Sequence, residues 1–366
     1  MGNSNKFITM ALQSSGSISF TEIAAEFGYP NNNKFGNYRI DEDIPVADGG
    51  ELGELPLDVN IPQSGQIKFS DFYGASLNVV VDCYKGNAQN RVNAKTDKWN
   101  NDKVVVIGGF RGKKQNGSRI IIHVNKQFAH DSENANGGVS NNCALRTGDF
   151  DSADAVVVDI GSSAKLYGSG GQGGAGADHG KSDGSNDGAP GSFGTSALGV
   201  EFNGAVVNVA SGGMLRCGYG GGGGGGSGSD EDPGADRTAG GGGGGGGAGL
   251  PAGGAGRGGT EGSDSGNADH GQGNPGNGGS LNAGGEGGEG GSSTSEVSGG
   301  NGGQGGGFNP SQSATAGGDS NGHDGSEGDG GAAGGNGAAI RKTSGYTITI
   351  NNSGTVTGAT NATGVN

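Results

Sequence analysis

The sequence has little of what an ordinary hydrophobic core is made from. Of its 366 residues, 29% are hydrophobic and 5% are aromatic, with one tryptophan. Most of the apolar residues lie before Tyr167 or after Ala339. Any conventional core should therefore be small and built from the two ends of the chain. No apolar run approaches the ~20 residues of a membrane-spanning helix, so we expect no membrane insertion.

Basic residues and cysteines are scarce as well. There are 22 Lys and Arg against 37 Asp and Glu, which gives a net charge of −15. A surface of this sign repels phosphate groups, so we expect no nucleic acid and no anionic membrane among the partners. The three cysteines, Cys83, Cys143 and Cys217, lack the spacing of a metal site, and an odd number does not indicate a disulfide framework.

Signatures of catalysis are missing too. The sequence has no G-x-x-x-x-G-K-[ST] motif, and G-x-G-x-x-G matches arise by chance in a chain so rich in glycine. His123 alternates with Ile122 and Val124 as on a strand face, with no catalytic partner in sight. The acidic run 230–232 is interpreted as a solvated turn rather than a cation site. We expect no enzymatic activity, no catalytic residues, no cofactor and no metal.

The residue that the chain does contain in quantity is glycine, with 91 copies concentrated between 168 and 339. In the stretch 168–176 the other residues, Ser169, Gln172 and Ala175, recur at every third position, and the same spacing returns at 284–291 and 299–306. A period of three matches neither an α-helix nor a strand, but it matches the polyproline-II helix. Collagen also has this period, but it is excluded because it needs abundant proline and this chain has 9.

The sequence therefore predicts a bundle of polyglycine-II helices. In each helix one column bears side chains and the other two are bare backbone, so neighbouring helices approach until their N–H and C=O groups pair. The runs 220–226 and 240–247 have no side chain in any column and should be central. The alternative is a disordered linker, because glycine loses more backbone entropy on folding than any other residue.

Three similar segments adjoin the glycine region and argue against a linker. They are 157–168, 206–218 and 347–358, and each reads as a strand, a tight polar turn and a second strand. We expect each to form a β-hairpin that anchors the glycine helices. The β-branched runs at 77–84, 103–109 and 119–125 extend this β-rich character through 76–167.

An internal repeat marks the N-terminal section. SGSISFTEI at 15–23 matches SGQIKFSDF at 64–72. Thr21 and Ser70 are candidate N-caps, each followed by an acidic residue. So few apolar residues make a weak independent core, so we expect this section to dock on another protein. The candidate attachment residues are Ile18, Phe20, Ile23, Ile67, Phe69 and Phe72.

The predicted fold is mainly β plus a polyglycine-II helix bundle that is neither α nor β, with a small N-terminal module that contains a short α-helix. We place the N-terminal attachment module at 1–75 and a β-rich domain at 76–167. The glycine-rich bundle with polar loops, including a hairpin at 206–218, occupies 168–345. A C-terminal β-hairpin and tail occupy 346–366.

The N-terminal repeat resembles a short module of tailed-phage virion proteins, especially tail-fibre and tail-tip components. The alternation of glycine segments and polar loops is similar to the receptor-recognising tail-fibre adhesins of T-even-like phages. The resemblance implies a virion location, attachment to other phage tail or fibre proteins, and loops that bind a receptor on the bacterial outer surface, either protein or polysaccharide.

Polar stretches interrupt the period of three at 178–190, 229–238, 260–270, 292–298 and 309–327. We read them as loops between helices, where binding residues usually gather, and expect the longest to lie at a distal end. The candidate receptor-binding residues are Asp178, His179, Lys181, Asp183, Asn186, Asp264, Asn267, His270, Phe308, Asn309, Gln312, Asn321, His323 and Asp324.

The sequence thus indicates a phage adhesin, and two other interpretations stay open. One is a purely structural tail-tip or fibre protein whose loops bind nothing. The other is a soluble polyglycine-II protein that binds ice or another surface, against which the uneven acidic loops and the N-terminal module argue.

Overall fold

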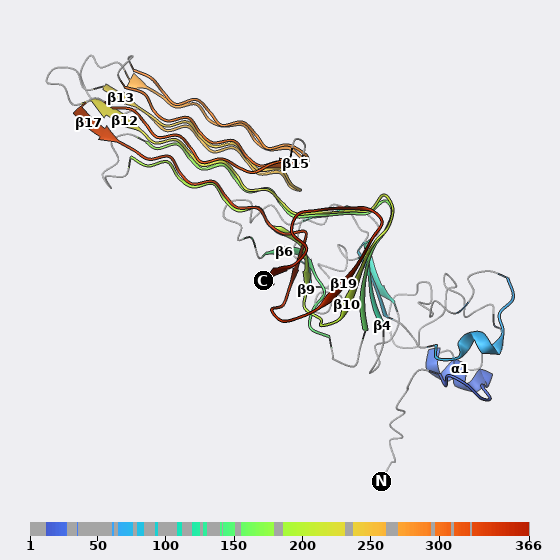
Figure 1. The fold of residues 1–366 in the computed structure, drawn as a ribbon. Coiled ribbons are helices and arrows are strands. Elements are labelled where there is room, and N and C mark those ends of the chain that lie inside the picture. Colours follow the sequence, from blue (N-terminus) through green and yellow to red (C-terminus); the bar gives the residue numbers. More distant parts are fainter. Residues whose placement is uncertain are drawn as a thin grey trace, which may run out of the picture.

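The computed structural model describes residues 12–27, 35, 61, 65–75, 79–83, 92–93, 108–111, 119–124, 127–129, 140, 142–150, 155–178, 186–230, 237–260, 270–293, 297–308, 311–322 and 324–365. Figure 1 shows three parts: a small N-terminal module with α1, a body of parallel strands, and a long bundle of extended segments. Strands far outnumber helices among the described elements, which confirms the expectation of a mainly β fold.

The N-terminal module contains α1 (Phe20–Phe27) and the short 3-10 helix η2 (Phe69–Phe72). Ser19 caps α1: its N–H and hydroxyl both donate to the Glu22 carboxylate, while its hydroxyl oxygen accepts from the Glu22 N–H. In the second copy the Asp71 carboxylate accepts from the Lys68 N–H. The caps expected at Thr21 and Ser70 were wrong, because each helix begins earlier than the acidic residues suggested.

The body is built from three sheets whose strands come from the same positions of successive coils. The first sheet runs β3 (Gly108–Arg111), β1 (Val79–Cys83), β4 (Arg119–Val124), β7 (Ala155–Ile160), β10 (Ala205–Val209) and β19 (Ile348–Asn352). The second runs β5 (Gln127–Ala129), β8 (Lys165–Tyr167), β11 (Met214–Arg216) and β20 (Thr355–Thr357). The third runs β2 (Val92–Asn93), β6 (Cys143–Arg146), β9 (Ser196–Val200), β18 (Ile340–Lys342) and β21 (Ala362–Thr363).

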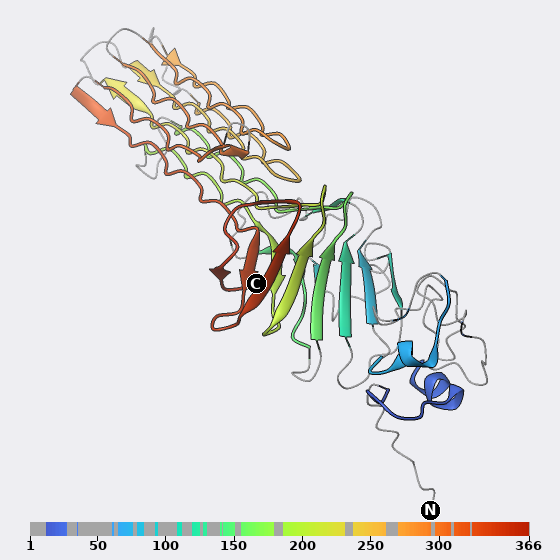
Figure 2. The ribbon, with the colours of Figure 1, turned by 45° about the vertical axis from the view of Figure 1, so that its right-hand side comes forward.

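From β4 onward the chain visits these three sheets in a fixed order, and equivalent strands pair in parallel. Val158, for example, lies in register with Ile122 on one side and Val207 on the other. The result is a three-sided β-solenoid, in which the strands of the first sheet stand side by side (Figure 2). Its core fills with one inward row from each sheet, including Ile122, Leu166 and Leu198, which are fully buried.

The expected hairpins were wrong. The two strands of the segment 157–168, β7 and β8, belong to different sheets, and so do β10 and β11, and β19 and β20. Each strand pairs instead with its equivalent in the next coil, as Val206 does with Val157. Period-two alternation indicates that a strand has a buried face and a solvated face. It does not show whether that strand pairs with the next strand in the sequence, as in a hairpin, or with the equivalent strand of a neighbouring coil.

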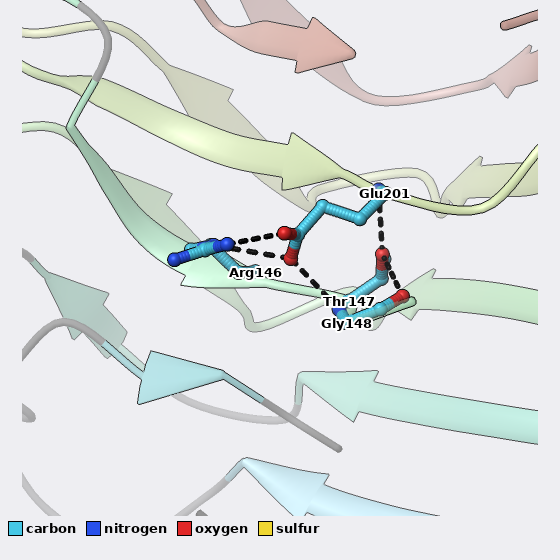
Figure 3. Close-up of polar contacts among 4 residues, drawn as sticks. All are labelled: Arg146, Thr147, Gly148 and Glu201. Atoms are coloured by element: carbon cyan, nitrogen blue, oxygen red, sulfur yellow. Dashed lines mark hydrogen bonds and ion pairs between the residues drawn. The ribbon is translucent and has the colours of Figure 1, made fainter. Parts of the chain in front are cut away.

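A polar cluster fixes one corner of the solenoid, where β6 and β9 end (Figure 3). The Glu201 carboxylate accepts from both the Nε and Nη2 of Arg146 and from the Gly148 N–H. The Glu201 N–H in turn donates to the Thr147 hydroxyl oxygen at 2.9 Å. The hydrogen bond to Glu201 raises the pKa of Arg146 above its ordinary value. Because these residues belong to adjacent coils, the cluster clamps one coil to the next.

The glycine region forms ten extended segments that run alternately away from the solenoid and back. They are 168–178, 186–195, 217–230, 237–249, 251–260, 271–280, 283–293, 297–308, 311–322 and 327–338. Hydrogen bonds between two segments repeat every three residues: Gly171, Gly174 and Ala177 donate to the carbonyls of Tyr219, Gly222 and Gly225.

Two of these segments are enclosed by the others. Segment 217–230 exchanges backbone hydrogen bonds with 168–178, 186–195, 237–249, 297–308, 311–322 and 327–338. Segment 237–249 does so with 168–178, 217–230, 251–260, 271–280, 283–293 and 297–308. Every residue of 220–226 and of 240–247 is buried. The central position expected for these two runs is thus what the structure has.

The boundaries drawn at 167 and 345 do not follow the sheets. Strands β9, β10 and β11 lie between glycine segments in the sequence, yet they pair with β6, β7 and β8 of the solenoid. The bundle is therefore two insertions into one solenoid, 168–195 and 217–339. Both leave from the end of the second sheet and return to the start of the third, so they emerge at the same corner.

Replacing Gly243 with valine should destabilise the bundle by about 3 kcal/mol or more, at or above the upper end of overpacking effects. A Cβ atom there would collide with the carbonyl oxygen of Gly256, while a Cβ atom at Gly278 would lie 3.7 Å from its nearest neighbour, the carbonyl oxygen of Gly253. We expect Gly243→Val to lose the bundle's unfolding transition in calorimetry. The matched variants Gly278→Val and Glu286→Val should unfold like the parent, and equal melting of all three would contradict the stacked arrangement.

Candidate functional site at the distal end of the bundle

The bundle has two unlike ends. We call proximal the end beside the solenoid, and distal the opposite end, which carries a small sheet of β14 (His270–Gly271), β13 (Arg237–Ala239), β12 (Gly228–Asp230) and β17 (Asp324–Glu327) (Figure 1). The described ends that flank residues 179–185, 231–236, 261–269, 294–296 and 323 all lie distally. At the proximal end the segments are joined near 250, 281–282 and 309–310.

The candidate receptor-binding residues divide between these ends and the part of the chain outside the description. Asp178, Asn186 and Asn321 lie at the distal end, as do the backbones of His270 and Asp324. Phe308 and Gln312 lie at the proximal end. The others, His179, Lys181, Asp183, Asp264, Asn267, Asn309 and His323, fall outside the described residues.

Asp178 is the most strongly bound of the distal candidates. Its two carboxylate oxygens accept from Arg257, Nη1 to Oδ1 at 2.7 Å and Nη2 to Oδ2 at 2.6 Å. The N–H and hydroxyl of Thr260 donate to the same Oδ1 at 2.8 and 3.1 Å. This fork-to-fork pairing raises the pKa of Arg257 above its ordinary value. Asp178 therefore ties the ends of segments 168–178 and 251–260 together rather than presenting a free carboxylate.

Other polar groups fix the remaining distal ends. Ser320 is buried and central among them: its hydroxyl donates to the carbonyl of Ser227 at 2.9 Å and accepts from the Gly328 N–H at 2.7 Å. The carbonyl of Asn186 accepts from the Ser227 N–H, and Asn321 exchanges two backbone hydrogen bonds with Ser298. These contacts hold the distal ends of the segments rigidly together. We call these joined ends the platform, and the connections between segments extend from it.

An ion pair joins the two strands on either side of residues 231–236. Arg237 Nη1 lies 3.4 Å from Asp230 Oδ2, and Asp230 is 1% exposed. Sequence reasoning missed Arg237, Arg257, Thr260 and Ser320 as distal residues. Arg257 carried a readable signal, because it is a basic residue inside a period-three run, GAGRGGT at 254–260.

The rim of the platform is acidic. Asp187, Asp319, Glu327 and Asp329 are exposed there. Three of these carboxylates also accept backbone N–H groups of an adjoining stretch: Asp187 from Asp329 at 2.9 Å, Asp319 from Gly330 at 2.9 Å and Glu327 from Gly322 at 3.3 Å. They replace the carbonyl partners that segments at the surface of the bundle lack, and they leave negative charge facing solvent.

Phe308 lies at the proximal end of the bundle and therefore does not belong to this site. Its ring packs edge-on against Tyr219 at 4.7 Å, and the Arg216 guanidinium lies 4.9 Å from its centre. The neighbouring Cys217 thiol is buried, which raises its pKa to about 11. Phe308 packs at the junction of the bundle and the solenoid. The chain runs along the bundle an even number of times between Tyr219 and Phe308, so Phe308 returns to the end at which Tyr219 lies. Gln312, beside it, donates to Gln304 at 2.6 Å.

The attachment candidates lie together in the N-terminal module, but most of them form its own core. Ile23, Ile67 and Phe72 are buried with Leu12, Ile61 and Ala75, and Ile18 packs against them. Phe20, Phe35 and Phe69 make a triangle of rings with centres 4.6 to 4.9 Å apart. Phe69 is 38% exposed. The module thus has a core of its own, and the surface available for docking narrows to Phe69 and its neighbour Phe20.

In the described part of the chain, no helix has the length and apolar character to cross a membrane, and no group of three or more His, Cys, Asp or Glu could hold a metal ion.

No family model and no curated protein matches the sequence. Among solved structures, the chain is similar to one from the gp37–gp38 adhesin tip complex of the bacteriophage S16 long tail fibre. The TM-score is 0.36 and the identity 17%, over 95% of this chain and 99% of that chain. A TM-score of this size does not establish a common fold.

Replacing Asp178 with alanine should loosen the distal platform while the bundle stays folded. Arg257 and the Thr260 N–H lose their shared acceptor, at a cost of about 1 kcal/mol because both remain within reach of water. We expect the Thr260 amide to exchange with deuterium about fivefold faster. Glu289→Ala, which removes an exposed carboxylate from the side of the bundle, is the control. Unchanged exchange in Asp178→Ala would show that the clamp does not hold these ends.

Proposed function

We propose that this chain is a phage tail-fibre or tail-tip adhesin whose glycine segments are polyglycine-II helices. The helical assignment is supported by hydrogen bonds that repeat every three residues and by six hydrogen-bonded neighbours around each central segment. Three residues per turn is the periodicity of this helix type. In a β-sheet each strand has at most two neighbours and a period of two, so the glycine segments are not sheet.

The observation that carries the adhesin proposal is the asymmetry of the two ends. The proximal joins near 250, 281–282 and 309–310 are short, while three of the five distal connections, 179–185, 231–236 and 261–269, are longer and polar. The other two distal connections, at 294–296 and 323, are short. The described ends that flank the longer connections thus lie at the end of the bundle remote from the solenoid and the N-terminal module (Figure 2). A rigid scaffold that gathers its longer loops at its free end is typical of a recognition surface.

The receptor is proposed to be a protein or polysaccharide of the bacterial outer surface. The distal connections supply Ser, Asn, Asp and His side chains, which suit hydrogen-bonding ligands. The revised contact set comprises His179, Lys181, Asp183, Asn186, Asp264, Asn267, His270, Asn321, His323 and Asp324. Phe308 and Gln312 leave it because they lie at the proximal end, and Asn309 leaves with them because it lies between them in the sequence. Asp178 leaves it because Arg257 and Thr260 engage its carboxylate.

The N-terminal module is proposed to attach the chain to other phage tail or fibre proteins, which places it in the virion. Phe69 is the aromatic side chain of the module that is exposed beside a ring cluster. No enzymatic activity and no cofactor are part of the proposal. The second candidate function, a purely structural fibre component, is favoured by the platform itself, since its described polar groups are engaged in holding the bundle together.

Exchange of the distal connections tests the adhesin against the structural protein. Replacing 179–185 and 261–269 with Gly-Ser chains of equal length should abolish or redirect adsorption of particles to host cells. The flanking hydrogen bonds are unaffected, so calorimetry and particle assembly should not change. The same exchange at the proximal join 281–282 is the matched control and should leave adsorption intact. Normal adsorption and host range in the distal variant would favour the structural protein.

A charge at Phe69 tests attachment separately. Phe69→Glu places a carboxylate on the exposed side of the ring cluster, so it should block docking without emptying the core around Phe72. We expect the variant chain to keep its melting temperature and receptor binding but to be missing from purified particles. Ser70→Glu, an exposed neighbour, is the control. Deletion of 1–74 should have the effect of Phe69→Glu, and incorporation of the deleted chain would disprove this role.

A further inference from the structure

The two ends of the solenoid are finished differently. At one end the first sheet closes with β3, which runs antiparallel to β1 and contains Arg111. At the other end, among the described residues, β19 is the last strand of that sheet and has β10 as its single partner. Exposed edge strands invite pairing with another chain, and proteins usually protect them with charged residues or proline.

The coil that contains β19 carries no such protection. Residues 343–366 include no Asp, Glu, Lys, Arg, His or Pro. The rest of the chain bears the whole net charge of −15. The inward side chains of this coil, Ile348, Ile350 and Val356, are partly exposed, whereas Val207 and Leu215 one coil earlier are fully buried. One more coil would cover this uncharged edge strand and the partly exposed side chains of the core.

The direction of the backbone groups is fixed by the pairing with β10. The Thr347 carbonyl accepts from Gly204, and the Ser353 N–H donates to the Val209 carbonyl. Since successive residues of a strand point to opposite sides, the N–H and C=O groups of Ile348, Ile350 and Asn352 face away from β10. These residues provide the donors and acceptors that another strand would meet.

We propose that two copies of this chain join end to end through β19, as an antiparallel pair centred on Ile350. In a two-fold antiparallel pair of edge strands the axis lies between a residue and its own equivalent, and we centre the pair on a residue whose hydrogen-bonding groups face the partner. Ile350 lies in the middle of the three outward-facing residues, so Ile348 pairs with Asn352 of the second copy and Ile350 with its own equivalent. The two Ile350 side chains then meet in a shared core.

The partner is a second copy of this chain because the edge strand β19 is complementary to its own copy. In this register Thr349 lies opposite Asn351, and both are exposed on the outer face. The polar ladder there already runs from Asp159 through Asn208 to Asn351, with amide groups donating at 2.6 and 2.8 Å. The Thr349 hydroxyl extends it across the junction. Two chains of net charge −15 repel each other, and this neutral coil offers them a contact that places no charge against charge.

Complementary charges at the two facing positions test both the partner and the register. One variant carries Thr349→Lys with Asn351→Lys, and the other carries Thr349→Glu with Asn351→Glu. Like charges directly opposite destabilise strand pairs, so each variant alone should dissociate about tenfold or more readily than the parent and behave as a 35.3 kDa monomer in light scattering. Mixed, they should form a one-to-one dimer that salt weakens.

The controls keep folding apart from assembly. Both variants should melt like the parent, and Ser162→Lys, in an exposed turn of the solenoid, should dimerise normally. A parent chain that is monomeric over a wide concentration range would overturn the proposal. So would Lys or Glu variants that still dimerise alone, or a mixture that stays monomeric.

Discussion

The fold depends on the direct approach of one peptide backbone to another without side chains between them. At Gly222, Gly225 and Gly245 an added Cβ atom would collide with the carbonyl oxygen of a neighbouring segment. At this separation the N–H and C=O groups of the central segments pair with six neighbours, and every buried donor needs such a partner. Glycine is therefore required by contact distance along most of the bundle, and its conformational freedom is a cost that the hydrogen bonds must offset.

The solenoid lowers that cost by fixing where each glycine insertion begins and ends. Segment 168–178 starts directly after β8, and Gly168 donates to the carbonyl of Arg216, the last residue of β11. Thr195, which ends the first insertion, accepts from Gly218, the second residue of the second insertion. A loop whose ends are already held has less closure entropy to lose. The apolar coils thus supply the stability, and the bundle extends the molecule without a hydrophobic core of its own.

The sequence predicted the features that depend on residues close together in the chain. The period of three and the two runs without side chains placed 220–226 and 240–247 at the centre of the bundle, because the pattern itself says which columns are bare. It did not reveal that strands such as β7 and β10 pair across a coil, because alternation is the same for either partner. The inserted bundle also hid the solenoid, since β11 and β18, consecutive in space, are separated by 217–339.

The same distinction explains the outcome for the candidate site. Loop composition marked polar stretches at 178–190, 229–238 and 260–270, which overlap distal connections. It was wrong for 309–327, because residues 311–322 form a segment of the bundle. Whether a connection is distal depends on how many segments precede it. Phe308 follows an even number of crossings after Tyr219 and so returns to the solenoid, where Arg216 and Tyr219 cover it. Asp178 follows one crossing and reaches the far end, yet its spacing from Arg257 and Thr260 is a property of the packed bundle and not of any one segment.

The glycine bundle and its distal connections differ in how far they tolerate amino-acid substitution. Most glycine positions within the bundle admit almost no substitution, because an added Cβ atom would collide with the backbone of a neighbouring segment. The platform residues Asp178, Arg257 and Ser320 hold the ends of neighbouring segments together. Residues 179–185 and 261–269 join segment ends that these clamps and the backbone hydrogen bonds of the bundle hold in place. Selection on binding can therefore act on them while the packing that positions them stays the same.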